Sequence, residues 1–137
     1  MRELGLPAEK LKLVRRGLPK WQAPSERVGF GNPIEILSVG RLVPKKGYFD
    51  QLLILRAMRQ ARLAFRARIV GGGPLKEELE RERDRLDLAP YITFLGPLSE
   101  EETHRLYAET DLFLFTGRTA PDGDRDGVPN VIPEAMA

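Results

Sequence analysis

The 137-residue sequence predicts an α/β fold, with a parallel β-sheet covered by helices on both faces. Two observations lead to this prediction. Apolar runs of strand length recur along the chain, and most are followed by a loop containing Gly or Pro and then by a segment with helical spacing of apolar residues. Repeated strand and helix units need crossover connections, which make neighbouring strands parallel and place helices over the sheet.

The chain divides into an N-terminal segment and a sheet domain. Residues 1–32 are interpreted as a strand and a connector, and residues 33–137 as the sheet domain. Within the first segment, residues 11–14 alternate in polarity like a strand, whereas residues 19–32 carry the Pro, Ser and Gly of a connector.

The first strand and helix unit occupies residues 34–59. Residues 34–39 are a candidate for a buried strand, residues 40–47 for a turn, and residues 49–59 for a helix. The apolar side chains expected on one face of that helix are Phe49, Leu52, Leu53 and Met58.

The second unit repeats this order in a more charged segment. A strand is predicted at residues 65–70, a Gly-Gly-Gly-Pro turn at residues 71–74, and a helix at residues 75–86. The buried side of this helix is expected to consist of Leu75, Leu79 and Leu86.

The third unit has a strand at residues 91–95 and a helix with a clear beginning. Ser99 is followed three residues later by Glu102, which is the pattern of a capping box. Leu106 and Tyr107 supply the apolar face of this helix. His104 of the same helix is expected to face solvent.

A fourth strand is predicted at residues 112–115, and a last helix from Val128 onward. Pro129 would lie in the first turn of that helix, where a missing amide hydrogen costs little. Parallel sheets bind ligands at the carboxyl ends of their strands. The loops that leave this edge are at residues 40–47, 71–74 and 116–129, so the candidate site is expected there.

Composition excludes several classes of protein. The chain has no Cys, so it has neither a disulfide framework nor a thiolate metal site. Its 22 basic and 20 acidic residues are interspersed, which argues against a nucleic-acid-binding stripe. No apolar run is long enough for a membrane span, and no export signal is recognisable, so a cytoplasmic protein is expected.

Two cations flank the turn after the first strand. Arg41 and Lys46 lie on either side of Pro44, and the turn could direct both at one diphosphate. A charge-assisted hydrogen bond of this kind contributes about 1.5 to 3 kcal/mol. Lys45 is expected to point to solvent, because only one of two adjacent lysines faces inward. Ordinary surface cations remain the alternative.

The glycine turn at residues 71–74 permits close approach of a ligand to the main chain. It does not fit the dinucleotide fingerprint, because Lys76 stands where the third glycine would be, and it lacks the Lys-Ser/Thr ending of a P-loop. A tight turn without a ligand is the equal alternative.

The loop near the C-terminus is acidic and rich in glycine. Asp126, the backbone amides at Gly127 and Val128, and the later Glu134 form a set suited to a ligand rich in hydroxyls and phosphate. The alternative from another class is a calcium loop formed by Asp122, Asp124 and Asp126. That pattern is incomplete, because Pro133 stands where an EF-hand has its bidentate Glu. An inert folding fragment is a third alternative.

Four segments together resemble one known family. They are residues 38–47 (SVGRLVPKKG), 69–74 (IVGGGP), 92–96 (ITFLG) and 126–137 (DGVPNVIPEAMA). In this order they resemble the C-terminal half of retaining GT-B glycosyltransferases, the group 1 family. The acidic stretch looks most like members that build bacterial exopolysaccharides of the colanic acid type.

The resemblance implies a Rossmann-like domain that binds a UDP- or GDP-linked sugar without a metal. Arg41 and Lys46 would hold the diphosphate, Asp126 would face the sugar, and Glu134 would accept hydrogen bonds from the ribose. Asp126 departs from the Glu usual in the family. The other donor-binding positions that the resemblance implies are Gly40, Gly72, Gly73, Leu95, Gly96, Gly127, Val128, Pro129 and Asn130.

The resemblance also implies what the full-length enzyme does. It would transfer a hexose from the nucleotide sugar to an acceptor with retention of configuration, and it would be cytoplasmic, with peripheral membrane association left open. The donor domain here is expected to be incomplete at its C-terminus, and the N-terminal acceptor domain to be missing. The isolated chain is therefore expected to bind donor at most.

Overall fold

The computed structural model of the protein describes residues 29–120, 123–125 and 129–136. The strand predicted at residues 11–14 and most of the connector lie outside these ranges.

Four parallel strands form one sheet in the order β3-β2-β1-β4. The strands are β1 Ile34–Val39, β2 Phe65–Val70, β3 Ile92–Gly96 and β4 Leu112–Phe113. This confirms the predicted parallel sheet, and β1 and β2 have the predicted bounds. The strand predicted at residues 91–95 lies one residue later, and the one predicted at residues 112–115 is only two residues long.

The short length of β4 has a physical cause at Leu114. Its amide still donates to the carbonyl of Leu37 at 2.9 Å. Its own carbonyl oxygen, however, lies 2.8 Å from the Ser38 hydroxyl and 3.4 Å from the Gln51 amide nitrogen. Because two buried polar side chains take this acceptor, the chain leaves the ladder here.

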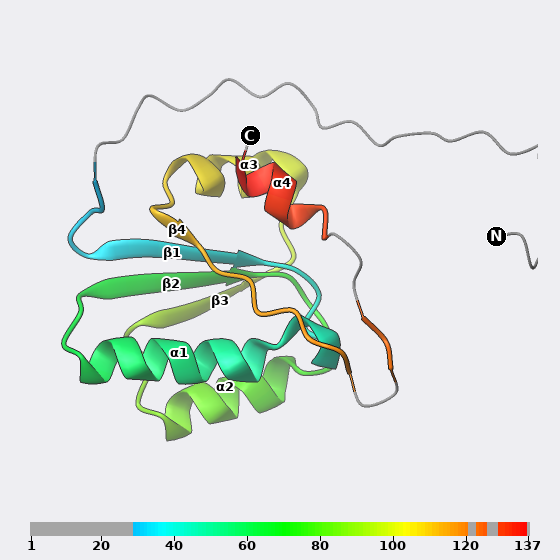
Figure 1. Cartoon of the computed structure of the whole chain (residues 1–137), viewed down its shortest axis with the longest axis horizontal. Coiled ribbons are helices and arrows are strands. Elements are labelled where there is room, and N and C mark those ends of the chain that lie inside the picture. Colours follow the sequence, from blue (N-terminus) through cyan, green and yellow to red (C-terminus); the bar gives the residue numbers. More distant parts are fainter. Residues whose placement is uncertain (1–28, 121–122, 126–128, 137) are drawn as a thin grey trace, which may run out of the picture.

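Helices cover both faces of the sheet, as predicted. Figure 1 shows α1 and α2 on one side, and α3 and α4 on the other. The helices are the 3-10 turn η3 Pro44–Lys46, α1 Tyr48–Gln60, α2 Lys76–Arg85, α3 Glu100–Ala108 and α4 Val131–Met136.

The order of the strands creates a switch point between β1 and β4. The connections through α1 and α2 carry the chain outward from β1 to β3, whereas α3 brings it back to the other side of β1. With right-handed crossovers, this reversal puts the following helices on the opposite face. A crevice for ligands forms where the loops of two such strands diverge.

The core lies mainly between the sheet and the α1 and α2 layer. Ile36, Ile69 and Ile92 of the strands pack against Leu52 of α1 and Leu79 of α2. The predicted face of α1 is wrong at one position: Leu53 is 53% exposed, and Leu55 is buried instead. The buried positions follow a stripe from Tyr48, and Leu53 lies on its far side.

The first residues of α3 and α4 test two predictions about where helices begin. The capping box of α3 is confirmed, with the Ser99 amide 2.8 Å from a Glu102 carboxylate oxygen. The predicted start of the last helix is wrong, because α4 begins at Val131 and Pro129 precedes it. The Ile132 amide donates to the Pro129 carbonyl at 3.1 Å and the Glu134 amide to the Asn130 carbonyl at 3.0 Å, so Pro129 lies before the helix and accepts from its first turn.

Main-chain contacts join the loops that follow β1, β2 and β3. The Gly71 amide donates to the Gly96 carbonyl at 2.8 Å, and the Leu42 amide donates to the Gly72 carbonyl at 3.0 Å. Gly71 has a φ of 134°, and a Cβ there would overlap the carbonyl oxygen of Gly40. The β1 and β2 loops therefore approach this closely at Gly40 because Gly71 has no side chain.

We expect Gly71→Ala to lower the free energy of unfolding by about 2 to 5 kcal/mol, from backbone strain plus overlap with Gly40. Gly96→Ala is the control, because Gly96 also has a positive φ, 76°, but a Cβ there would meet nothing within 4 Å. Gly96→Ala should lower the free energy of unfolding by only about 1 to 2 kcal/mol. Urea unfolding monitored by circular dichroism measures both, and equal losses would contradict the role of the close contact.

Candidate functional site

The loop after β1 is shaped by η3 and by the glycine that ends it. Pro44 opens the turn, and the Gly47 amide donates to the Pro44 carbonyl at 3.1 Å. Gly47 has a φ of 65°, and a Cβ there would overlap the carbonyl group of Thr116. The β1 loop and the segment after β4 thus touch through their backbones.

The cations of this loop have different surroundings. Arg41 is exposed, whereas Lys46 is half-buried, with its Nζ 5.4 Å from the centroid of the Phe115 ring. Lys45 was expected to face solvent, but its side chain is only 25% exposed and its Nζ lies 3.0 Å from a carboxylate oxygen of Asp124. The expectation failed because the chain after β4 folds back along this loop.

Thr116 and Arg118 hold that returning segment. The Thr116 hydroxyl lies 2.7 Å from the Gly47 carbonyl oxygen, and the Arg118 amide donates to the Lys45 carbonyl at 2.9 Å. The Arg118 side chain also forms an ion pair with Asp50 at 3.4 Å. Sequence reasoning missed these residues, and the only signal for Thr116 is a polar residue directly after an apolar run.

Tyr48 fixes the other end of the β1 loop from the start of α1. Its hydroxyl donates to the Gly40 carbonyl at 3.0 Å, and its side chain is almost fully buried. Burial raises the pKa of Tyr48 well above its usual value, so the hydroxyl remains a protonated donor even in alkaline solution.

The predicted glycine positions lie next to the β1 loop. Besides the bond from the Leu42 amide to the Gly72 carbonyl, a Cβ on Gly73 would overlap the Leu42 backbone. Leu95 is 37% exposed, and Gly96 takes up a positive φ at the end of β3. The structure therefore brings Gly40, Gly72 and Gly73 beside the cation loop, with Leu95 and Gly96 on the far side of the glycine turn.

The predicted positions near the C-terminus are only partly described. Pro129 is half-buried, Asn130 is exposed, and Glu134 is half-buried on α4. Asp122, Asp126, Gly127 and Val128 lie outside the described residues. Within the described ranges, no hydrogen bond or ion pair links the Glu134 carboxylate to the cations of the β1 loop.

Glu134 has a different neighbour on α3. The hydroxyl of Tyr107 is buried and has no hydrogen-bond partner within the described part of the chain. Burial raises the pKa of Tyr107, and the negative charge of Glu134 raises it further. The Tyr107 ring packs on Phe113, with centroids 5.7 Å apart.

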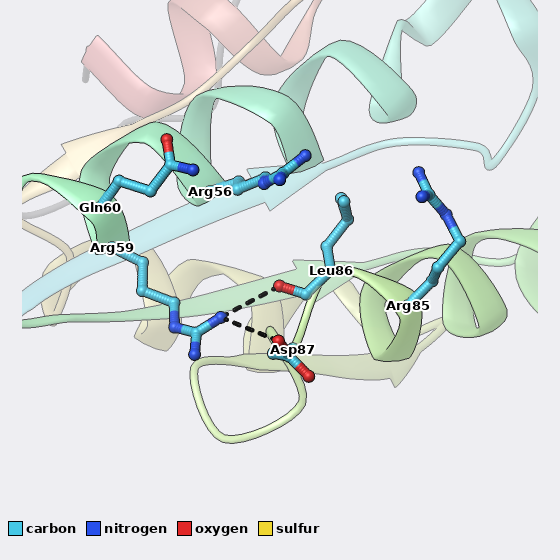
Figure 2. Close-up of a pocket in the computed structure, with 6 residues that line it drawn as sticks. All are labelled: Arg56, Arg59, Gln60, Arg85, Leu86 and Asp87. Carbon is cyan, nitrogen blue, oxygen red and sulfur yellow. Dashed lines mark hydrogen bonds and ion pairs between the residues drawn. The ribbon is translucent and has the colours of Figure 1, made fainter.

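A hollow of about 410 Å³ lies elsewhere, between the C-terminal ends of α1 and α2 (Figure 2). It is lined by Arg56, Arg59, Gln60, Arg85, Leu86 and Asp87. Its charges are largely satisfied internally. Arg59 reaches the Leu86 carbonyl and Asp87, at 3.2 and 3.6 Å, and Arg85 pairs with Glu82 at 2.6 Å.

Glu82 explains why this hollow is a weaker candidate than the loops. Hydrogen bonding to Arg85 lowers the pKa of Glu82, and the charges of Arg85 and Arg56 lower it further. This carboxylate thus compensates the Arg85 guanidinium. The hollow also lies at the end of α1 opposite to the β1 loop, so we locate the candidate site at the loops.

Two further sequence predictions concern histidine and metals. His104 was expected to face solvent, but it is half-buried, because α3 packs along the sheet. Among the residues that the structure describes, no three His, Cys, Asp or Glu side chains gather in a cluster fit for a metal ion. No helix in the same ranges is long and apolar enough to cross a membrane.

Comparison with known proteins identifies related sequences. The chain is 36% identical over 135 residues to the amylovoran biosynthesis glycosyltransferase AmsK of Erwinia amylovora, a match that covers 98% of this chain and 33% of AmsK. It is 31% identical over 138 residues to the putative colanic acid biosynthesis glycosyltransferase WcaL of Escherichia coli, covering 100% of this chain and 34% of WcaL. The chain thus spans about a third of the length of these relatives.

A solved structure and a family model agree with these relatives. HepE of Anabaena, solved in complex with UDP and glucose, superimposes with a TM-score of 0.60 at 30% identity, over 77% of this chain and 27% of HepE. The fold is the predicted Rossmann-like sheet of GT-B glycosyltransferases. The model of the family "Glycosyl transferases group 1" matches residues 20–137. The chain therefore belongs to the group 1 glycosyl transferases.

Proposed function

We propose that this chain binds the nucleotide-sugar donor in a retaining glycosyltransferase of bacterial polysaccharide synthesis. The observation that carries the proposal is the pair Arg41 and Lys46 on one short loop, at the carboxyl end of β1 and beside the switch point of the sheet. A diphosphate has the charge and size to meet two such cations. AmsK and WcaL support the polysaccharide class, and the UDP and glucose held by HepE support the ligand class.

The chemical task of the two cations is to stabilise the leaving group. When the bond between the sugar carbon and the phosphate oxygen breaks, negative charge develops on the diphosphate. Arg41 and Lys46 compensate that charge from the β1 loop, so we assign this role to the two cations and propose no metal for it. The sugar is transferred to an acceptor with retention of configuration in the whole protein.

The remaining roles follow the family resemblance. Gly40, Gly72 and Gly73 let the nucleotide approach the main chain, and the backbone at Leu95 and Gly96 contacts the base. Asp126 faces the sugar, and Glu134 accepts hydrogen bonds from the ribose. The turn that leads into α4, at Gly127, Val128, Pro129 and Asn130, contributes its polar backbone to the diphosphate.

The calcium-loop alternative is weakened by one contact. Asp124, its central carboxylate, lies 3.0 Å from the Lys45 ammonium. A cation already occupies one side of this carboxylate, which does not suit a ligand set for a second cation. The inert fragment is the remaining alternative, and binding measurements separate it from the donor site.

We expect the chain to bind UDP or GDP, and Lys46→Met to weaken that binding about 10-fold or more, because one charge-assisted bond contributes about 1.5 to 3 kcal/mol. Binding of the uncharged nucleosides uridine and guanosine should stay unchanged. Isothermal titration calorimetry measures the affinity for the diphosphates and for the nucleosides.

Lys45→Met is the matched control for this experiment, since Lys45 is adjacent but paired with Asp124. It should change the affinity by less than about threefold. Equal losses of diphosphate affinity in the two variants would contradict the assignment of Lys46. If the wild-type chain binds neither UDP nor GDP, the inert fragment is the alternative that stands.

Glu134→Gln should weaken binding of the ribonucleoside diphosphate by about 10-fold, because a carboxylate accepts hydrogen bonds from hydroxyls more strongly than an amide oxygen does. The variant should have no effect on the analogue that lacks both ribose hydroxyls. Glu101→Gln, an exposed acid on α3, is the control. An equal loss of affinity for the nucleotide and for its analogue would assign Glu134 a structural role. Heat of binding on titration with calcium instead of nucleotide would favour the calcium loop.

A further inference from the structure

Phe115 is the aromatic residue that faces a cation of the candidate diphosphate site. It follows β4 and Leu114, and the Nζ of Lys46 lies 5.4 Å from its ring centroid. A cation within about 6 Å of a ring centroid is attracted to the negative face of the ring. This contact joins the switch-point strand β4 to the proposed leaving-group cation of the β1 loop.

The ring is held in place by the chain that follows it. A Cβ added to Gly117 would overlap the Phe115 ring, so the Gly117 backbone packs directly against it. Between them, the Thr116 hydroxyl lies 2.7 and 3.2 Å from the carbonyl oxygens of Gly47 and Lys46. The segment that carries the ring is thus bonded to the residue that it faces.

We propose that Phe115 is a positioning residue that holds the Lys46 ammonium ready for the diphosphate of the donor. The proposal rests on the proposed function, because it assigns the ring a role in binding that ligand. Phe115 acts through Lys46 and does not itself touch the reacting atoms.

An aromatic partner lowers the free energy that is needed to order a lysine side chain when a ligand binds. A Lys side chain has several rotatable bonds, and ordering it on ligand binding costs free energy. A ring face orders the ammonium before the ligand arrives, and it does so without cancelling the positive charge.

The neighbouring lysine has the other kind of partner. Lys45 is ordered by the carboxylate of Asp124, which compensates its charge. The two adjacent lysines thus contact partners of different chemistry, a carboxylate at Lys45 and a ring at Lys46. A ring, unlike a carboxylate, adds no negative charge of its own beside the diphosphate.

The test compares Phe115→Leu with Phe115→Tyr in binding UDP, GDP and the two nucleosides. Leu keeps an apolar side chain but removes the ring face, and should weaken diphosphate binding about two- to fivefold, the fold-change of a cation–π contact. Tyr keeps the ring and should retain wild-type affinity. Nucleoside binding should be the same in all three proteins.

A double-mutant cycle with Lys46→Met isolates the pairwise effect. Once Lys46→Met has removed the ammonium, Phe115→Leu should cause no further loss of diphosphate affinity. Tyr91→Leu is the matched control, because Arg59 lies 5.8 Å from the Tyr91 ring at the other end of the sheet. It should leave diphosphate affinity unchanged.

The outcomes separate the positioning role from the proposed function. If the wild-type chain binds neither diphosphate, the proposed function fails, and the role of Phe115 fails with it. If the wild-type chain binds and Phe115→Leu binds equally well, only the positioning role is wrong. Equal loss for diphosphate and nucleoside, or an undiminished effect of Phe115→Leu in the Lys46→Met background, would also overturn it, since either result means a general structural effect.

Discussion

The loop after β1 is held by backbone contacts on both of its sides, and the candidate site depends on this constraint. On the β2 side, Gly71 lets the next loop touch the Gly40 carbonyl. On the β4 side, Gly47 lets the Thr116 carbonyl approach the loop equally closely. Without side chains at these two positions, the loop packs between the β2 loop and the segment after β4. The contact of Lys46 with Phe115 follows from that placement.

Two buried polar residues connect this constraint to the end of β4. Ser38 and Gln51 lie 2.8 Å apart, and both reach the carbonyl of Leu114. A buried polar group needs a hydrogen-bond partner, and these three satisfy one another. Because the Leu114 carbonyl bonds to these side chains, the chain turns away from the sheet directly before Phe115. The short strand thus brings Phe115 and Thr116 to Lys46.

Much of the fold could be predicted from local patterns. β1 and β2 were predicted with correct bounds, although Glu35, Arg66 and Arg68 interrupt their apolar residues, because Gly40 and Gly71 mark where each strand ends. The capping box gave the start of α3, because both partners lie in one short segment. The prediction failed at Leu53, where an exposed apolar residue on α1 was assigned to the core.

The candidate site was predictable only in part, because its contacts join distant segments. Arg41 and the glycine turn could be identified from residue types and spacing. The contacts of Lys45 with Asp124 and of Lys46 with Phe115 could not, since each partner lies far along the chain. The start of α4 was also missed, since either Pro129 or Pro133 is compatible with a first helical turn.

The contacts between the β1 loop and the segment after β4 differ in their dependence on salt. The Lys45 and Asp124 pair is partly exposed, at 25% and 56%, so it contributes at most about 1 kcal/mol and is screened by salt. The Thr116 bonds to the Lys46 and Gly47 carbonyls are half-buried and neutral, and salt affects them little. The contribution of the Lys45 and Asp124 pair therefore falls as salt rises, whereas the Thr116 contacts persist. The backbone beside Lys46 is thus held by contacts that do not depend on that ion pair.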